Sequence, residues 1–206
     1  MIRALIDLIR SVQKPGMVVA EVGCHSGDTS RFIAPLMSEC GGTLIAVDWF
    51  EGTADTPATN DHGHRPDEAD ALEVKFRQGI QPWQHVVHIL RGDSTEMARQ
   101  VSDASLDVCF IDADHRYSKV KQDIAAWEPK VKKGGIFCGH DCEMLPPFRE
   151  FTEAELEADN APILIPPVPM MVHCGVVWAV WERYGQRAKL LYDLDGIEPP
   201  CWMVQM

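Results

Sequence analysis

Residues 18–30 read VVAEVGCHSGDTS, and this stretch decides the fold. The apolar run from Val18 to Val22 is typical of a buried strand, and the polar residues that end the stretch suit the first turn of a helix. Between them, Gly23 and Gly27 allow a tight turn and leave room for a ligand to approach the backbone. The stretch therefore predicts a strand, a glycine turn and a helix, the unit at which α/β proteins bind nucleotides.

Two acidic residues indicate the kind of nucleotide. A second predicted strand ends at Asp48, about 20 residues after the turn, where a carboxylate can accept hydrogen bonds from ribose hydroxyls. Glu21 would repel a pyrophosphate, and His25 stands where a dinucleotide-binding turn could have its middle glycine. A carboxylate in that place suits a cofactor with a positively charged amino-acid end. The residues thus favour S-adenosylmethionine over NAD.

The chain up to residue 141 alternates between predicted strands and predicted helices. Strands are predicted at 18–22, 43–48, 85–90, 106–112 and 135–139, and helices at 29–39, 69–79, 94–101 and 118–131, with a further helix before the first strand. Such alternation is typical of a parallel, doubly wound α/β sheet.

Four segments, taken in order, resemble class I S-adenosylmethionine-dependent methyltransferases. The pattern Glu21-x-Gly23-x-His25-x-Gly27 resembles their motif I, Asp48 their ribose-binding acid, and residues 91–94 the segment that meets the adenine. Residues 110–117 and 133–141 are similar to the small-molecule O-methyltransferase branch, of the macrocin and sugar O-methyltransferase type (Methyltransferase 24), which is related to the catechol and caffeoyl-CoA type. The resemblance extends over roughly residues 12–141.

This resemblance implies a Rossmann-like α/β fold with a seven-stranded, mostly parallel sheet, one antiparallel strand and helices on both faces. It implies S-adenosyl-L-methionine as the cofactor and a hydroxyl of a small molecule as the acceptor. The cofactor-binding residues that it implies are Glu21, Gly23, His25, Gly27, Asp48, Trp49, Gly92, Asp93, Ser94 and Asp112.

A metal site is expected where the fourth and fifth predicted strands end. Asp112 and the pair His140-Asp141 follow these neighbouring strands, so two carboxylates and an imidazole come within reach of one divalent ion. In the catechol and caffeoyl-CoA type, an acid and an acid-amide pair at these positions hold a magnesium-like metal. The histidine departs from that pattern and suits Mn, Fe or Zn better than Mg. Both the identity of the metal and the dependence on one stay open.

His115 is the expected general base. It follows Asp112 by three residues, where the related enzymes have a lysine base, and an unperturbed pKa of about 6.5 suits a base near neutral pH. The expected mechanism has a metal that lowers the pKa of the acceptor hydroxyl and a histidine that takes its proton. A metal-free version with His140 as a second base or an orienting group is the alternative.

Simpler interpretations of these residues stay open. Asp112 is also a favoured type of helix N-cap, and His115 is compatible with a place on the surface. The pair His140-Asp141 is compatible with a hydrogen-bonded loop that binds no metal.

Composition excludes several classes of function. The formal net charge of -12 disfavours binding to the phosphates of nucleic acids, so nucleic acid is not an expected partner. No apolar run reaches the roughly 18 residues of a membrane span, and the N-terminal residues lack the features of a signal peptide. The seven cysteines show no disulfide framework, so a reduced, cytoplasmic protein is expected.

The chain is expected to form a single domain over residues 1–206, because its length suits one α/β core. Residues 50–67 are rich in Gly, Pro, Asp, Asn and His and are expected to form a lid or substrate loop. Residues 142–206 resemble the family weakly and are expected to close the sheet, with a helix at 148–158, a buried strand at 172–181 and a last strand at 189–194.

Three rival functions remain at this stage: a NAD-dependent oxidoreductase, a non-catalytic S-adenosylmethionine-binding protein, and a methyltransferase that acts on nucleic acid or protein. The amphipathic N-terminal helix would serve either a homo-oligomer interface or a cap on the sheet.

Overall fold

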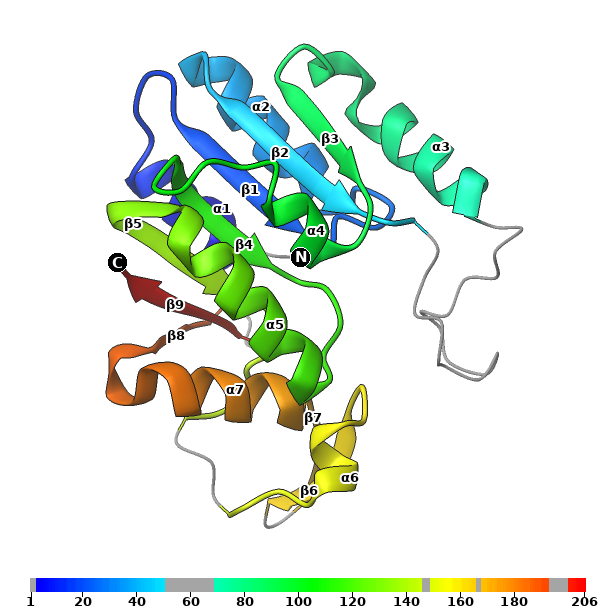
Figure 1. The fold of residues 1–206 in the computed structure, drawn as a ribbon, viewed down its shortest axis with the longest axis vertical. Helices are drawn as coiled ribbons and strands as arrows, with labels where there is room; N and C mark the ends of the chain where they lie inside the picture. The colour runs from blue at the N-terminus through cyan, green and yellow to red at the C-terminus, as the bar shows by residue number, and fades with distance from the viewer. Residues whose placement is uncertain (1–2, 51–68, 146–148, 166–167, 193–199) are drawn as a thin grey trace.

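A seven-stranded sheet organises the chain (Figure 1). The computed structural model describes residues 3–50, 69–145, 149–165, 168–192 and 200–206, so most of the predicted lid at 50–67 lies outside the described residues. The strand order is β3-β2-β1-β4-β5-β9-β8. The strands are β1 (Val18–Val22), β2 (Thr43–Asp48), β3 (Val87–Arg91), β4 (Leu106–Ile111), β5 (Val131–Gly139), β8 (Lys189–Leu191) and β9 (Cys201–Gln205).

The direction of the strands confirms the predicted fold class. β3, β2, β1, β4 and β5 pair in parallel, whereas β9 runs antiparallel to both of its neighbours, β5 and β8. β9 is thus the one antiparallel strand that was expected. Because the parallel strands all end on the same edge, the loops that follow β1, β2, β4 and β5 meet there.

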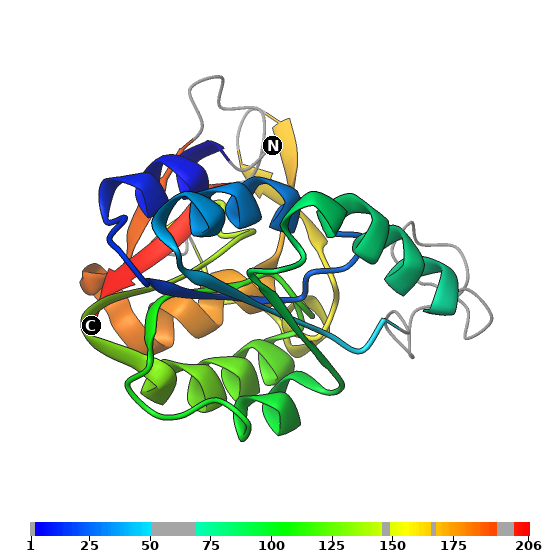
Figure 2. The ribbon, with the colours of Figure 1, turned by 90° about the horizontal axis from the view of Figure 1, so that it is seen from above.

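Helices cover both faces of the sheet (Figure 2). On one face, α1 (Arg3–Ser11), α2 (Ser30–Cys40) and α3 (Ala69–Ile80) contribute to one buried apolar cluster. On the other face, α4 (Ser94–Ala98), α5 (Tyr117–Trp127) and α7 (Cys174–Tyr184) contribute to a second one. Short 3-10 helices follow at Gln81–Trp83, Glu128–Lys130 and Gly185–Arg187. The two clusters sandwich the sheet, which explains why its central strands are mostly apolar.

The N-terminal helix caps the first of these two cores. Leu5 and Ile9, one turn apart in α1, are fully buried, while Arg3, Asp7 and Arg10 face outward. The apolar face of the helix is therefore used within the chain.

The C-terminal part departs from the prediction in its elements. Residues 172–181 were expected to form a strand, and this is wrong: most of them lie in α7, which packs on α5. A continuous apolar run rich in Val and Trp fits a buried helix as well as a buried strand, because neither period is visible in it. Gly175 allows α7 to pack close to the loop before α5, because a Cβ at this position would lie 2.2 Å from the carbonyl oxygen of His115.

The remaining C-terminal elements are short. The helix predicted at 148–158 is only α6 (Glu153–Leu156), which begins at a capping box between Thr152 and Glu155. A two-stranded antiparallel hairpin follows, formed by β6 (Ala161–Ile165) and β7 (Val168–Val172). The sheet is completed by β8, which overlaps the strand predicted at 189–194, and by β9, for which no residue range was predicted.

Two further expectations can be compared with the structure. Over the described ranges, every helix falls short of the combination of length and apolar character that crossing a bilayer demands. The seven cysteines are all free thiols, as expected from the absence of a disulfide framework.

Candidate active site

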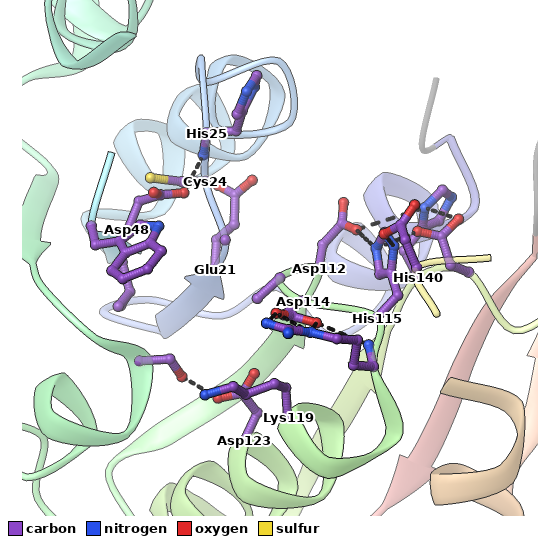
Figure 3. A pocket seen from close by; sticks show the side chains of 18 of the residues that line it. Glu21, Cys24, His25, Asp48, Asp112, Asp114, His115, Lys119, Asp123 and His140 are labelled. Atoms are coloured by element: carbon purple, nitrogen blue, oxygen red, sulfur yellow. Dashed lines mark hydrogen bonds and ion pairs between the residues drawn. The ribbon is translucent and has the colours of Figure 1, made fainter. Parts of the chain in front are cut away.

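A cavity of about 1270 Å³ opens at the edge where the parallel strands end. Apart from Gly27, all of the predicted site residues line it. Figure 3 shows two groups in this cavity: Glu21, Cys24 and Asp48 at one end, and Asp112, His115 and His140 at the other. The residues singled out from the sequence therefore lie around one continuous cavity.

The glycine turn brings two loops into contact. Gly23 has a positive φ of 91°, and a Cβ at this position would lie 2.0 Å from the backbone oxygen of Asp112. Only glycine lets the loop after β1 approach the loop after β4 so closely. Gly27 shapes the turn without lining the cavity: its N–H donates to the Cys24 carbonyl at 2.8 Å, and its Cα faces Phe76 of α3.

Asp48 ties the turn to the end of β2. Its Oδ2 accepts the backbone N–H of His25 at 2.7 Å, and its Oδ1 accepts that of Phe50 at 2.7 Å. The first bond holds His25 at a positive φ of 45°, which a non-glycine residue rarely adopts. Each carboxylate oxygen keeps a further lone pair for a ligand, and Trp49 lines the cavity beside it. This chemistry fits the predicted ribose-binding role.

Glu21 is a buried carboxyl at the floor of the cavity, with 1% of its surface exposed. The hydroxyl of Ser30 donates to it. Burial, together with the nearby carboxylates of Asp112 and Asp48, raises the pKa of Glu21 to about 8. A cation nearby stabilises the ionised form of such a buried carboxyl. The donor set therefore fits the positively charged amino-acid end of S-adenosylmethionine.

Asp93 and Ser94 have structural partners at the predicted adenine end. Asp93 caps α4: its Oδ1 accepts the backbone N–H of Thr95 at 2.9 Å and that of Glu96 at 3.2 Å, and the Thr95 hydroxyl donates to it as well. These bonds, that of the Thr95 hydroxyl first, lower the pKa of Asp93. Gly92 donates its N–H to the Asp48 backbone oxygen at 3.0 Å, so this segment is fixed to β2.

The hydroxyl of Ser94 leads to an acid that sequence reasoning missed. It donates to Asp123 of α5 and accepts the indole N–H of Trp127 at 2.9 Å. Asp123 lines the cavity but is only 5% exposed, and its burial raises its pKa to about 7. Asp123 is a single aspartate within the helical residues 117–127, and nothing in the sequence around it predicted that it would line the cavity.

At the other end of the cavity, two imidazoles and two carboxylates face one another. Nε2 of His115 lies 3.0 Å from Oδ2 of Asp141, and Nδ1 of His140 lies 3.1 Å from Oδ1 of Asp141. Oδ1 of Asp112 lies 3.9 Å from each of these two ring nitrogens. The loops after β4 and β5 place these groups, since the backbone N–H of Asp112 donates to Val22 and that of His140 to Ile111.

The charges in this group are strongly coupled. Burial by itself would lower the pKa of His115, but the carboxylates of Asp112, Asp141 and Asp159 outweigh burial and raise it well above the usual value. For the same reason, Asp141 and Asp112 raise the pKa of His140 to about 9. Burial disfavours the ionised form of Asp141, yet the two imidazoles hold its pKa below the usual range.

The predicted metal ligands come together. One ligand atom each from Asp112, His140 and Asp141 lies within 4.8 Å of the others. Two carboxylates and an imidazole at this spacing fit a divalent cation, and the imidazole favours Mn, Fe or Zn. Asp141 is held at a positive φ of 57°, a conformation that turns its carboxylate toward both histidines and that aspartate tolerates better than most residues.

Three further residues of this region were missed from the sequence. Asp159 lies 2.8 Å from Nδ1 of His115, and Glu143 lies 2.5 Å from Nδ1 of His173. All three come from the C-terminal part, where the resemblance is weakest. In the sequence, the one feature that could have drawn attention to them is the position of His173 directly before the apolar run of α7.

Comparison with known proteins gives the class. A sequence model whose family is described as a methyltransferase domain matches residues 20–142, more than half of the chain. No curated protein matches the chain. The matched residues contain the glycine turn, Asp48 and both groups of the cavity, so fold and site define a Rossmann-like methyltransferase. The chain belongs to this methyltransferase-domain family, and the predicted S-adenosylmethionine-dependent class is confirmed.

Solved structures share this fold at low sequence identity. The O-methyltransferase NovP matches with a TM-score of 0.61 and 17% identity, over 99% of this chain and 78% of NovP. CalS11, a TDP-rhamnose 3'-O-methyltransferase of calicheamicin biosynthesis, matches with a TM-score of 0.53 and 18% identity, over 98% of this chain and 74% of CalS11. An rRNA methylase from Streptococcus thermophilus matches with a TM-score of 0.57 and 13% identity, over 98% and 93% of the two chains.

Proposed function

We propose that this protein transfers a methyl group from S-adenosylmethionine to a hydroxyl of a small molecule, with help from a divalent metal and a histidine base. One observation carries the proposal. Asp112, His115, His140 and Asp141 converge in the same cavity as Glu21 and Asp48, the acids suited to the cofactor. A site for proton removal thus adjoins a site for the methyl donor.

The cofactor would lie along the end that the glycine turn forms. Glu21 would bind the ammonium group, and Asp48 would accept hydrogen bonds from the ribose hydroxyls. Backbone groups of residues 92–94 would meet the adenine, because the side chains of Asp93 and Ser94 are bonded within the protein. Bound S-adenosylmethionine supplies an electrophilic methyl group on a sulfonium.

Asp112, His140 and Asp141 would hold the metal. A divalent metal lowers the pKa of a hydroxyl that it contacts. The residues of the chain fix its place: Asp112 is tied to β1 through its backbone, and Asp141 is oriented by two imidazoles. The imidazole of His140 makes Mn²⁺ a better fit than Mg²⁺.

His115 would take the proton of the acceptor hydroxyl at Nε2. Asp159 lies on Nδ1, so the ring would keep the tautomer that leaves Nε2 as the acceptor. Without a cation, the surrounding carboxylates favour the protonated ring, which cannot act as a base. A divalent cation at Asp112 and Asp141 would offset that field, so metal and base would act together.

The charge of the cavity disfavours a nucleic-acid acceptor. Among its described lining residues, the basic side chains other than histidine are Arg116 and Lys119. The acidic ones number ten: Glu21, Asp28, Asp48, Asp93, Asp112, Asp114, Asp123, Asp141, Glu157 and Asp159. A phosphate backbone would be repelled at this entrance. A small hydroxylated acceptor therefore fits better than the substrate of an rRNA methylase.

The test is a methyl-transfer assay with labelled S-adenosylmethionine and a panel of sugars, phenols and macrolides. Wild type with Mn²⁺ should label an acceptor, and Asp141→Asn should lose the activity without losing affinity for S-adenosylhomocysteine. Asp103→Asn, which changes an exposed acid far from the cavity, is the matched control. Binding of NADH in place of S-adenosylhomocysteine would overturn the proposal in favour of an oxidoreductase. Binding without turnover of any acceptor would favour a non-catalytic binding protein.

A further inference from the structure

We infer that His115, Asp141 and His173 form a second divalent-cation site beside the first, with Asp141 shared between the two. One ligand atom from each of these three residues lies within 4.8 Å of the others. The inference rests on the proposed function in one respect: it assumes that His115 is the base, so that filling the second site stops methyl transfer.

The geometry places Asp141 among three imidazoles. Its Oδ2 lies 3.0 Å from Nε2 of His115, whereas its Oδ1 lies 3.1 Å from Nδ1 of His140 and 3.6 Å from Nδ1 of His173. The rings of His115 and His173 meet edge to face with centroids 4.6 Å apart. A carboxylate that presents its two oxygens to different nitrogen donors is suited to bridge two cations.

Each histidine of the second site also lies beside a further carboxylate. Asp159 lies 2.8 Å from Nδ1 of His115, which leaves Nε2, the atom that faces Asp141. Glu143 lies 2.5 Å from Nδ1 of His173, the same atom that lies 3.6 Å from Oδ1 of Asp141, so this carboxylate stands beside the donor atom of the second site. It also accepts the backbone N–H of His173 at 3.2 Å. Histidines that bind metals nearly always have a partner on the nitrogen away from the metal, as His115 has in Asp159, and this partner fixes the ring and raises its basicity.

The charge of the whole group calls for two cations. Four carboxylates, those of Asp112, Asp141, Glu143 and Asp159, each lie within 4.0 Å of an imidazole. With neutral imidazoles these four groups carry a charge of 4 × (−1) = −4, and the side chains of Asp141 and Glu143 are only 10% and 6% exposed. One divalent cation would leave two of these negative charges unbalanced, whereas two cations would balance all four.

The donor set also selects the kind of cation. Two imidazoles and one carboxylate suit Zn²⁺, Co²⁺, Mn²⁺ or Fe²⁺, whereas Mg²⁺ and Ca²⁺ prefer oxygen donors. A cation in this place would occupy Nε2 of His115, and the ring could then no longer accept a proton. The first equivalent of metal should therefore support methyl transfer, and the second should inhibit it.

The experiment measures stoichiometry on the full chain with CoCl2 alone. Equilibrium dialysis with elemental analysis should give two equivalents for wild type and one for His173→Gln, with the visible spectrum of Co²⁺ reporting each site. Asp112→Asn should also bind one equivalent, but with a different spectrum. His88→Gln changes an exposed histidine on β3 and should keep both equivalents. Glu143→Gln, which removes the carboxylate beside Nδ1 of His173 but keeps His115, Asp141 and His173, should weaken the second site, and circular dichroism checks that each variant folds.

The outcomes separate the inference from the proposed function. One equivalent for wild type that His173→Gln leaves unchanged, or no bound cobalt at all, overturns the second site. Methyl transfer is measured independently, so either result leaves the proposed transferase activity to be judged by its own assay. If the inference holds, wild-type turnover rises and then falls as Co²⁺ is added, and His173→Gln loses the falling phase.

Discussion

Asp159 holds His115 from 44 residues further along the chain, with its Oδ1 2.8 Å from Nδ1 of the imidazole. A carboxylate in this position stabilises the protonated ring and fixes its tautomer. Asp159→Asn should therefore lower turnover about 10- to 100-fold. Because one of the charges that raise the pKa of His115 is removed, the acidic limb of the pH–rate profile should move to lower pH. Methyl-transfer rates from pH 5 to 9 test this, and a lower rate with an unmoved limb would indicate a merely structural role.

Glu21 should make cofactor binding depend on pH. Its pKa of about 8 means that much of it is protonated at neutral pH, whereas a positively charged ligand favours the ionised form. Affinity for S-adenosylhomocysteine, which keeps the ammonium group, should rise as the pH increases through about 8. Glu21→Gln should bind about 10- to 100-fold more weakly and lose this dependence. Calorimetric titration at several pH values measures both, with Glu39→Gln as the control; a pH slope that survives in Glu21→Gln would contradict the assignment.

Asp123 should make the fold less stable as the pH rises from acidic to neutral values. Its pKa is about 7 in the folded chain against 3.8 for an ordinary aspartate, so the folded state binds the proton more tightly. The free energy of unfolding should fall as the pH rises from about 4 to about 7, by at most roughly 4 kcal/mol. Asp123→Asn keeps an acceptor for Ser94 and should be more stable than wild type at pH 8. Urea unfolding at pH 5 and pH 8 tests this; a constant difference between the two proteins would refute it.

Gly23→Ala should damage the site more than the fold. The added Cβ would lie 2.0 Å from the backbone oxygen of Asp112, so the loops after β1 and β4 would have to separate. Affinity for S-adenosylhomocysteine should fall at least about tenfold, while the far-ultraviolet circular dichroism stays that of the wild type. Gly134→Ala is the control, because it shares a positive φ but has nothing within 4 Å of the added Cβ. Equal losses in both variants would mean that backbone strain, and not the contact with Asp112, is responsible.

The sequence predicted the elements whose signals are local. The strand from Val18 to Val22, the turn at Gly23 and the acid at Asp48 follow one another within a short stretch, so spacing alone relates them. α7 was missed because a continuous apolar run carries no period, and its packing against α5 decides its form. Glu143, Asp159 and His173 reach the site only through long-range contacts, for which no spacing rule exists.

The contact of Gly175 with the loop of His115 has a consequence for how such enzymes can change acceptors. A Cβ at Gly175 would collide with the backbone at His115 and Tyr117, so the C-terminal part and the loop after β4 interlock without a spacer. Grafting residues 142–206 from a relative onto this chain would therefore also exchange the surroundings of His115, the proposed base. Such a chimera should fold only where the grafted segment also has a glycine at the position of Gly175.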